Sequence, residues 1–138
     1  MNQRVDRGVE LLLRLASASD AADRSAGEVP LRQARALLSL LGSDGMTVGE
    51  LSQAVGLSLP RTSRLVDQLV RTGHVQRERA ESDRRVVMVR LTRWGRPVAR
   101  RLFDARAAAL APVLEAAGPD RAEAFVGVLE GVVLRLES

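Results

Sequence analysis

Two groups of arginine residues carry most of the chemistry that this sequence offers. One group lies at 61–64, behind a serine and a proline, and the other lies in the polar stretch 77–85. A guanidinium group donates paired hydrogen bonds, so it fits the O6 and N7 atoms of guanine or the oxygens of a phosphate. Both groups fall in the segment 58–101, where 12 arginines against 4 acidic residues give a net charge of +8 in a chain of net charge +4. The segment indicates a polyanionic partner, most simply nucleic acid, and a solvated arginine-rich face is the alternative.

Residue types that are absent or rare exclude several other kinds of chemistry. The 138 residues include no cysteine and one histidine, His74, so disulfides, thiol chemistry and a zinc site are not expected. No nucleophile–histidine pair and no phosphate-cradling glycine loop is recognisable, which predicts that the chain is not an enzyme and uses no cofactor. His74 is expected to be a surface residue or a contact at the start of a strand.

The length and the distribution of charge predict one soluble domain. Charged residues interrupt the apolar residues at the N-terminus, so the start does not resemble a signal peptide, and no later stretch is apolar for the length of a membrane span. We therefore expect a cytoplasmic protein that does not interact with a membrane.

Apolar residues recur at helical spacing in six stretches. Between the fourth and the fifth of these, apolar residues alternate with polar ones in two short stretches. Thr47 and Glu50 have the spacing of a capping box, and Gly56 ends the short helix that follows. A polar loop is expected at 17–28, after the first helix. The other helices are expected at about 4–19, 30–41, 59–72, 92–117 and 119–137, and a two-stranded hairpin with a polar tip at 80–85 is expected after Gly73.

The helix at 59–72 is expected to be the one that meets DNA. Its order after a short helix and before a hairpin indicates a helix-turn-helix followed by a wing, although a bare corner of two helices occurs in other helical proteins too. Such a helix enters the major groove by its N-terminal turn, where free N–H groups also attract phosphates. The candidate DNA-binding residues there are Ser58, Pro60, Arg61, Ser63 and Arg64, and the inward stripe is Thr62, Leu65, Val66, Leu69 and Val70.

Two questions about this helix stay open in the sequence. Ser58 has the position of a helix cap, so its hydroxyl either only caps the helix or also contacts a phosphate. The pattern also does not decide which arginine reads a base.

The tip of the hairpin supplies a second candidate surface. A narrow minor groove has an enhanced negative potential that attracts an inserted arginine, and the tip contains Arg84 and Arg85 beside Asp83. A carboxylate this close in sequence can hold an arginine or the turn backbone in one conformation. The alternative is an ordinary solvated hairpin with weak surface ion pairs.

The sequence resembles the multiple-antibiotic-resistance regulator (MarR) family of winged helix-turn-helix transcription regulators. The resemblance rests on DRRVVMVRLTRWG at 83–95, LVDQLVRTGHVQR at 65–77 and QARALLSLL at 33–41. It implies a mainly α fold with a small β-hairpin wing, and an obligate homodimer that binds a palindromic double-stranded DNA operator. Carried over by position, Arg85 resembles the wing arginine that enters the minor groove, and Asp83 resembles the residue that positions it.

The two ends of the chain are expected to form the dimerisation stem. The last helix has a wide apolar stripe, and the first helix adds a second one, which is more than a single winged helix can cover; burial within one subunit is the alternative. We therefore expect a single domain at 1–138, with a DNA-binding lobe at about 30–95 and dimerisation helices at about 1–20 and 96–138. The apolar residues at the two ends are Val5, Val9, Leu12, Leu13, Ala122, Phe125, Val126, Leu129, Val132, Val133 and Leu136.

The resemblance also implies a repressor that a small organic ligand, phenolic or drug-like, releases from DNA. Trp94 is expected to pack in the core or to form the wall of a ligand pocket. A winged-helix module that binds an acidic protein through its arginine-rich face is the rival function. The operator, the regulated genes and the effector are not predictable from the sequence.

Overall fold

The computed structural model describes the backbone of residues 2–26 and 30–138, and the side chains of these residues apart from 19–26 and 31. It consists of two units, Met1–Phe103 and Asp104–Ser138, and each is described here by itself. No described helix has both the length and the apolar character that a membrane span needs.

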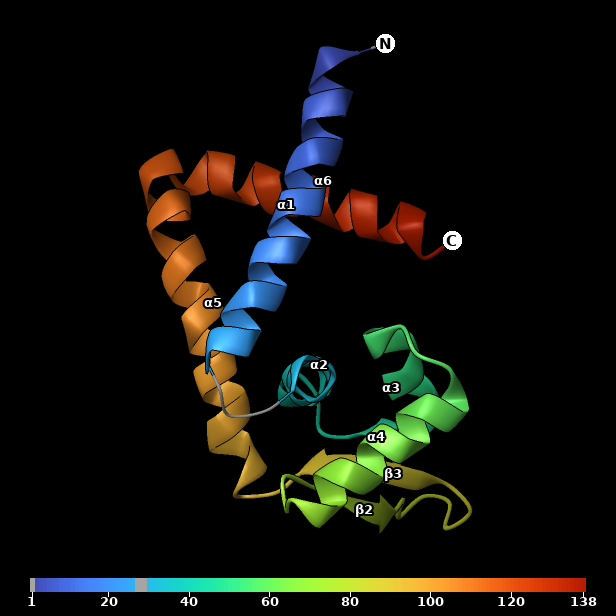
Figure 1. Cartoon of the computed structure of the whole chain (residues 1–138). Helices are drawn as coiled ribbons and strands as arrows, with labels where there is room; N and C mark the ends of the chain where they lie inside the picture. The colour runs from blue at the N-terminus through green and yellow to red at the C-terminus, as the bar shows by residue number, and fades with distance from the viewer. Residues whose placement is uncertain (1, 27–29) are drawn as a thin grey trace. The chain divides into compact units, whose positions relative to one another are not determined.

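The elements follow the expected order, and the mainly helical fold with a small antiparallel wing is confirmed (Figure 1). The second unit contains the later part of α5 and all of α6 (Pro119–Leu136), which begins after Gly118 with a positive φ of 86°. The first unit contains α1 (Gln3–Ala26), α2 (Leu31–Leu41), β1 (Met46–Thr47), α3 (Val48–Val55), α4 (Leu59–Arg71), β2 (Val75–Arg79), β3 (Val87–Leu91) and the start of α5 (Gly95–Ala117).

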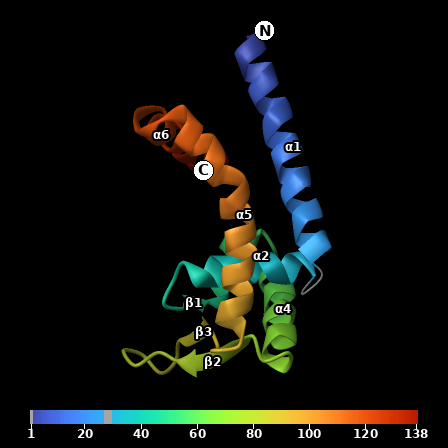
Figure 2. The ribbon, with the colours of Figure 1, turned by 90° about the vertical axis from the view of Figure 1, so that its left-hand side faces the viewer.

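The wing is a three-stranded sheet in the order β1-β3-β2, so the prediction of two strands was incomplete. Both pairings are antiparallel, with Met46 opposite Val89 and Val75 opposite Leu91. β1 has only two residues, which is too short for an alternating pattern to show. Figure 2 shows the β2–β3 hairpin extending from the lobe to its polar tip.

The first helix is longer than expected. The predicted end near residue 19 and the start of the predicted loop at 17–28 were wrong, because α1 continues to Ala26. The apolar pattern ends near residue 19, but alanine is frequent in the segment that follows it, and alanine has the highest helix propensity. The part of the predicted loop at 27–28 lies outside the described residues.

The core of the first unit forms around α2, which contributes Ala34, Leu37 and Leu40. Most of the predicted inward stripe of α4 is confirmed, but Val70 is 37% exposed because it lies at the edge of the buried face. The side chain of Leu31, the first residue of α2, is not among those that the structure describes. The other large buried side chains described are Leu51, Val55, Leu65, Val66, Leu69, Val75, Val89, Leu91, Val98 and Leu102.

The expected helix caps on both sides of α3 are present. Thr47 Oγ1 accepts a hydrogen bond from the Glu50 N–H at 3.1 Å, and the Glu50 side chain returns to the N–H of Thr47, which completes the capping box. Gly56 ends α3 with a φ of 70°, a conformation that favours glycine. The tight turn that follows sets the direction in which α4 leaves α3.

A compact joint connects the base of the wing to α5. The hydroxyl of Thr92 donates to the carbonyl of Gly73 and accepts the N–H groups of Trp94 (3.2 Å) and Gly95 (3.0 Å), while its own N–H donates to the carbonyl of His74 (3.0 Å). A Cβ atom on Gly95 would lie 1.9 Å from the carbonyl oxygen of His74, so no side chain fits there. The threonine and the glycine of LTRWG therefore build this joint: the threonine supplies its hydrogen bonds, and the glycine allows its close backbone contact.

Candidate nucleic-acid interface

The start of α4 is held by the residues that the sequence singled out. Ser58 is the N-cap, and its Oγ accepts the N–H of Arg61 at 3.4 Å. The Ser58 carbonyl accepts both the N–H and the hydroxyl of Thr62, each at 2.9 Å, which satisfies this buried threonine. Pro60 lies in the first turn, where its missing N–H costs nothing. The capping role of Ser58 is thus present, whatever else the hydroxyl contacts.

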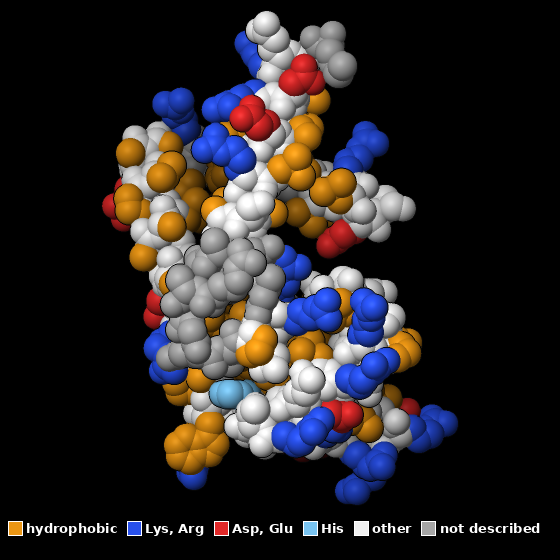
Figure 3. All heavy atoms as spheres, in the orientation of Figure 1, with side chains coloured by type: hydrophobic (Ala, Val, Ile, Leu, Met, Phe, Trp, Pro, Cys, Tyr) orange, Lys and Arg blue, Asp and Glu red, His pale blue; other side chains and the backbone are white. Residues whose placement is uncertain are grey.

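The arginines of this helix reach away from the core. Arg61 and Arg64 are exposed, whereas Ser63 is half-buried. Within the described part of the chain, neither guanidinium group has a hydrogen bond or an ion pair. Figure 3 shows that basic side chains gather over α4 and the β2–β3 hairpin. The exposed face of α4 therefore offers free donors and positive charge to a polyanion.

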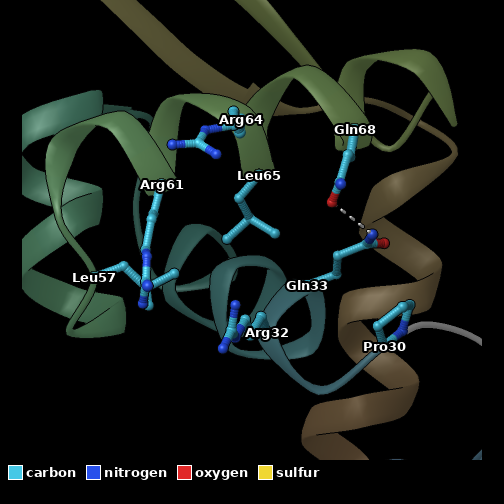
Figure 4. Close-up of a pocket in the computed structure, with 8 residues that line it drawn as sticks. All are labelled: Pro30, Arg32, Gln33, Leu57, Arg61, Arg64, Leu65 and Gln68. Atoms are coloured by element: carbon cyan, nitrogen blue, oxygen red, sulfur yellow. Dashed lines mark hydrogen bonds between the residues drawn. The ribbon is translucent and has the colours of Figure 1, made fainter.

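α4 has a side-chain contact to a neighbouring element on each of its two flanks. On one flank, Asp67 forms an ion pair with Arg77 of β2. On the other flank, Oε1 of Gln68 accepts a hydrogen bond of 3.4 Å from Nε2 of Gln33 in α2 (Figure 4). Arg77 lies in β2 opposite Val89, away from the hairpin tip, and its side chain reaches α4.

An open groove of about 660 Å³ lies between α2 and α4. Arg32 of α2 and Arg61 and Arg64 of α4 give it three guanidinium groups. Arg32 was not among the predicted site residues, because it is far from α4 in the sequence and only the folding of the chain brings the two together. The remaining lining residues are Pro30, Gln33, Leu57, Leu65 and Gln68.

The wing tip brings Asp83 and Arg85 together. The Asp83 carboxylate accepts the N–H of Arg85 at 3.0 Å, its Nε at 3.1 Å and its Nη2 at 3.2 Å. These hydrogen bonds, from the side chain first and the backbone second, hold the pKa of Asp83 below its ordinary value of 3.8. The side chain of Arg85 is 90% exposed. The carboxylate therefore orients an arginine that remains accessible.

A second arginine steadies the same tip from the strand. Nη1 of Arg79 donates to the carbonyl of Arg84 at 2.8 Å, and the N–H of Val86 donates to the carbonyl of Asp83 at 3.0 Å. Arg84 is exposed. Arg79 thus acts on the backbone of the tip, a use that a count of charges in the sequence does not reveal.

Arg90 connects the turn before β1 to the hairpin. Its Nη1 donates to the carbonyl of Asp44, and its Nε lies 3.0 Å from Oε2 of Glu78. The side chain also packs against Gly45, where a Cβ atom would be 3.0 Å from Cγ of Arg90. One arginine thus links the backbone turn before β1, the middle strand and the outer strand.

Two single residues can be compared with their predicted roles. Trp94 does not pack in the core: it is 65% exposed, and the guanidinium of Arg93 lies 4.6 Å from its ring centroid. The backbone N–H groups of Trp94 and Gly95 both donate to the hydroxyl of Thr92 at the tight joint, and the Trp94 side chain lies on the outside. His74 is half-buried at the start of β2, with Nδ1 2.7 Å from the hydroxyl of Thr72, which agrees with a contact at a strand start.

Comparisons with known proteins identify the architecture. The sequence profile of the MarR family matches residues 28–86. YfiV, an uncharacterized HTH-type transcriptional regulator of Bacillus subtilis (strain 168), is 29% identical over 121 residues, which are 88% of this chain and 74% of YfiV.

Solved structures agree over the length of the chain. A MarR family protein from Bacillus stearothermophilus is 30% identical, with a TM-score of 0.71 over 100% of this chain and 99% of that one. FabT of Streptococcus pneumoniae, solved in complex with DNA, shares the fold at 19% identity, with a TM-score of 0.78 over 96% of this chain and 97% of FabT. From the family profile, the full-length relative and the winged lobe together, this chain belongs to the MarR family of winged helix-turn-helix transcription regulators.

Proposed function

We propose that this regulator binds a palindromic operator as a homodimer, with α4 of each subunit in a major groove and each wing tip at a minor groove. The observation that carries the proposal is the set of exposed arginines at these two places, of which Arg85 is held by Asp83 at 3.0–3.2 Å. The relative FabT has been solved with DNA, which supports this use of the fold.

At α4, the proposed contacts come from the first two turns. The N-terminal N–H groups and the helix dipole favour phosphate there, and arginine pairs well with either phosphate or guanine. The candidate residues are Ser58, Pro60, Arg61, Ser63 and Arg64.

At the wing, Arg85 and Arg84 are the proposed minor-groove and phosphate contacts. Asp83 lowers the conformational freedom of Arg85 before DNA arrives, so less entropy is lost on binding. Arg79 contributes by holding the carbonyl of Arg84.

The proposed dimer uses the helices at the two ends of the chain. None of the side chains of α6 is buried, and Phe125 and Val126 are 42% and 45% exposed. In α1, Val5, Val9 and Leu13 are at least half exposed. Apolar stripes of this extent favour a partner of the same kind in a two-fold interface, with residues 30–95 left as the DNA-binding lobe. Light scattering at micromolar concentration is expected to give the mass of a dimer, and a monomer mass would contradict this interface.

Regulation is proposed to be repression by occupying a promoter. A small organic ligand, phenolic or drug-like, is proposed to change the spacing of the two α4 helices and so release the operator. Binding to chromosomal DNA is consistent with the cytoplasmic location expected from the sequence, which stays a prediction.

Selection of bound sequences from random duplexes tests the function. A palindromic consensus, with affinity that falls as salt rises, is the expected result. Binding without preference over random duplex would contradict the proposal and favour the rival function, an acidic protein partner for the arginine face.

A further inference from the structure

The contacts of α4 divide its exposed arginines between two positions. Asp67 faces the wing through Arg77, and Gln68 faces α2 through Gln33. At about 3.6 residues per turn, residues seven apart share a flank, so Arg61 lies on the α2 flank with Gln68. Arg64 lies one turn before both Asp67 and Gln68, and therefore between the two flanks.

The directions of the side chains agree with this division. Figure 4 shows Arg61 extending from α4 toward α2, where Arg32 lies, while the guanidinium of Arg64 stays beside α4. Among the described residues, neither Arg32 nor Arg61 has a side-chain partner, although both line the same groove. Arg64 also lines the groove and has no partner among them, so the groove holds three unneutralised cations, which indicates an anionic occupant.

The dimensions of the major groove of DNA indicate that this anion is a backbone phosphate. A helix with its side chains is about 10–12 Å wide, and the groove is about 12 Å wide, so a helix that enters it has a phosphate backbone on each side. An element packed along one flank of the helix meets that backbone. In this lobe that element is α2, and its residue at the groove is Arg32.

We propose that Arg32 and Arg61 together bind one backbone phosphate in the α2–α4 groove, while Arg64 reads a base edge. The inference rests on the proposed function and adds Arg32 to its contacts. The amides of Gln33 and Gln68 lie at the groove as further donors, and Leu57 and Leu65 add apolar surface to its lining.

Three single variants separate the two roles: Arg32→Gln, Arg61→Gln and Arg64→Gln. Each removes one positive charge from an exposed side chain. Affinity is measured for the selected operator and for a random duplex, across a series of salt concentrations. The matched control is Arg96→Gln, which removes the same charge from an exposed residue of the first unit outside the groove.

A phosphate contact and a base contact give different results. Arg32→Gln and Arg61→Gln are each expected to weaken both duplexes by the same factor and to reduce the salt slope, by at most about 0.9 per subunit for the one phosphate that the two arginines share. Arg64→Gln is expected to lower the ratio of operator to random affinity by roughly 5- to 150-fold. Arg96→Gln is expected to change neither quantity.

The inference and the function fail in different ways. An unchanged salt slope in Arg32→Gln, beside a wild-type protein that still prefers its operator, overturns the phosphate site and leaves the function intact. A changed specificity ratio in Arg32→Gln or Arg61→Gln, or an unchanged one in Arg64→Gln, overturns the division of roles. If the wild-type protein prefers no duplex, both the function and the inference are wrong.

Discussion

The recognition helix α4 and the wing tip present arginines to the same proposed ligand, but they hold them by different means. In α4, the buried side chains of Thr62, Val66 and Leu69 anchor the helix, and the guanidinium groups of Arg61 and Arg64 have no partner among the described residues. At the tip, no described residue from 80 to 86 is buried, and Arg85 is held by one carboxylate. The helix depends on the core for its position, whereas the wing depends on a local ion pair.

This difference predicts which changes separate folding from binding. Damage to the core moves or unfolds the helix and so affects both stability and DNA affinity. Damage at the tip affects affinity alone, because exposed ion pairs contribute little to stability.

The largest effect is expected from Leu69→Ala. The side chain is fully buried, so its loss leaves a cavity and costs about 2–5 kcal/mol in the free energy of unfolding. Urea denaturation at fixed protein concentration measures it. The control Val70→Ala, in the same helix but 37% exposed, is expected to cost less than about 1 kcal/mol. Equal losses for the two variants would refute the anchoring of α4 by the core.

The second effect is expected from Arg85→Ala at the tip. Operator affinity is expected to fall by roughly 10-fold or more, the usual effect of losing a charge-assisted hydrogen bond. The free energy of unfolding is expected to stay within about 0.5 kcal/mol of the wild-type value. Titration by fluorescence anisotropy gives the affinity, with Arg96→Ala as the control for a lost surface charge. Unchanged operator affinity would show that the wing assignment is wrong.

A smaller effect is expected from Ser58→Ala. Loss of the cap costs about 1 kcal/mol of stability, whereas Ser58→Gly costs only a few tenths. If the serine acts only as a cap, operator affinity measured on the folded protein stays unchanged in both variants. A fall in affinity for Ser58→Gly, with an unchanged salt slope because a hydroxyl carries no charge, would instead show that the hydroxyl also contacts a phosphate.

The smallest effect concerns pH. Because hydrogen bonds from Arg85 lower the pKa of Asp83 in the folded protein below 3.8, their contribution is fully present above that value. It is lost as the pH falls through the lower folded pKa. NMR titration of the Asp83 carboxyl carbon is expected to show a midpoint below 3.8 in the wild-type protein and a higher one in Arg85→Ala. A wild-type midpoint at or above 3.8 would contradict the ion pair.

The features that were predictable from the sequence are the local ones. Helical spacing, the Thr47–Glu50 box, the cap at Ser58 and the stop at Gly56 depend on residues a few positions apart, and each is present in the structure. The contact between Asp83 and Arg85 is equally local. These features place the two candidate surfaces and give them the right order along the chain.

The features that were missed depend on residues far apart in sequence. β1 exists because Met46 pairs with Val89, and the α2–α4 groove exists because α2 packs against α4, which brings Arg32 to the same surface as Arg61. The exposure of Trp94 follows from the joint that comes after it. No periodic pattern within one segment contains this information, because tertiary packing decides it.

The contact between Gly95 and His74 also determines how motion passes through the lobe. Two backbones that touch without an intervening side chain leave no slack to absorb a displacement. A displacement of the first turn of α5 would therefore be passed directly to His74, the residue before the first strand of the wing hairpin. The close contact thus couples the start of α5 to the base of the wing.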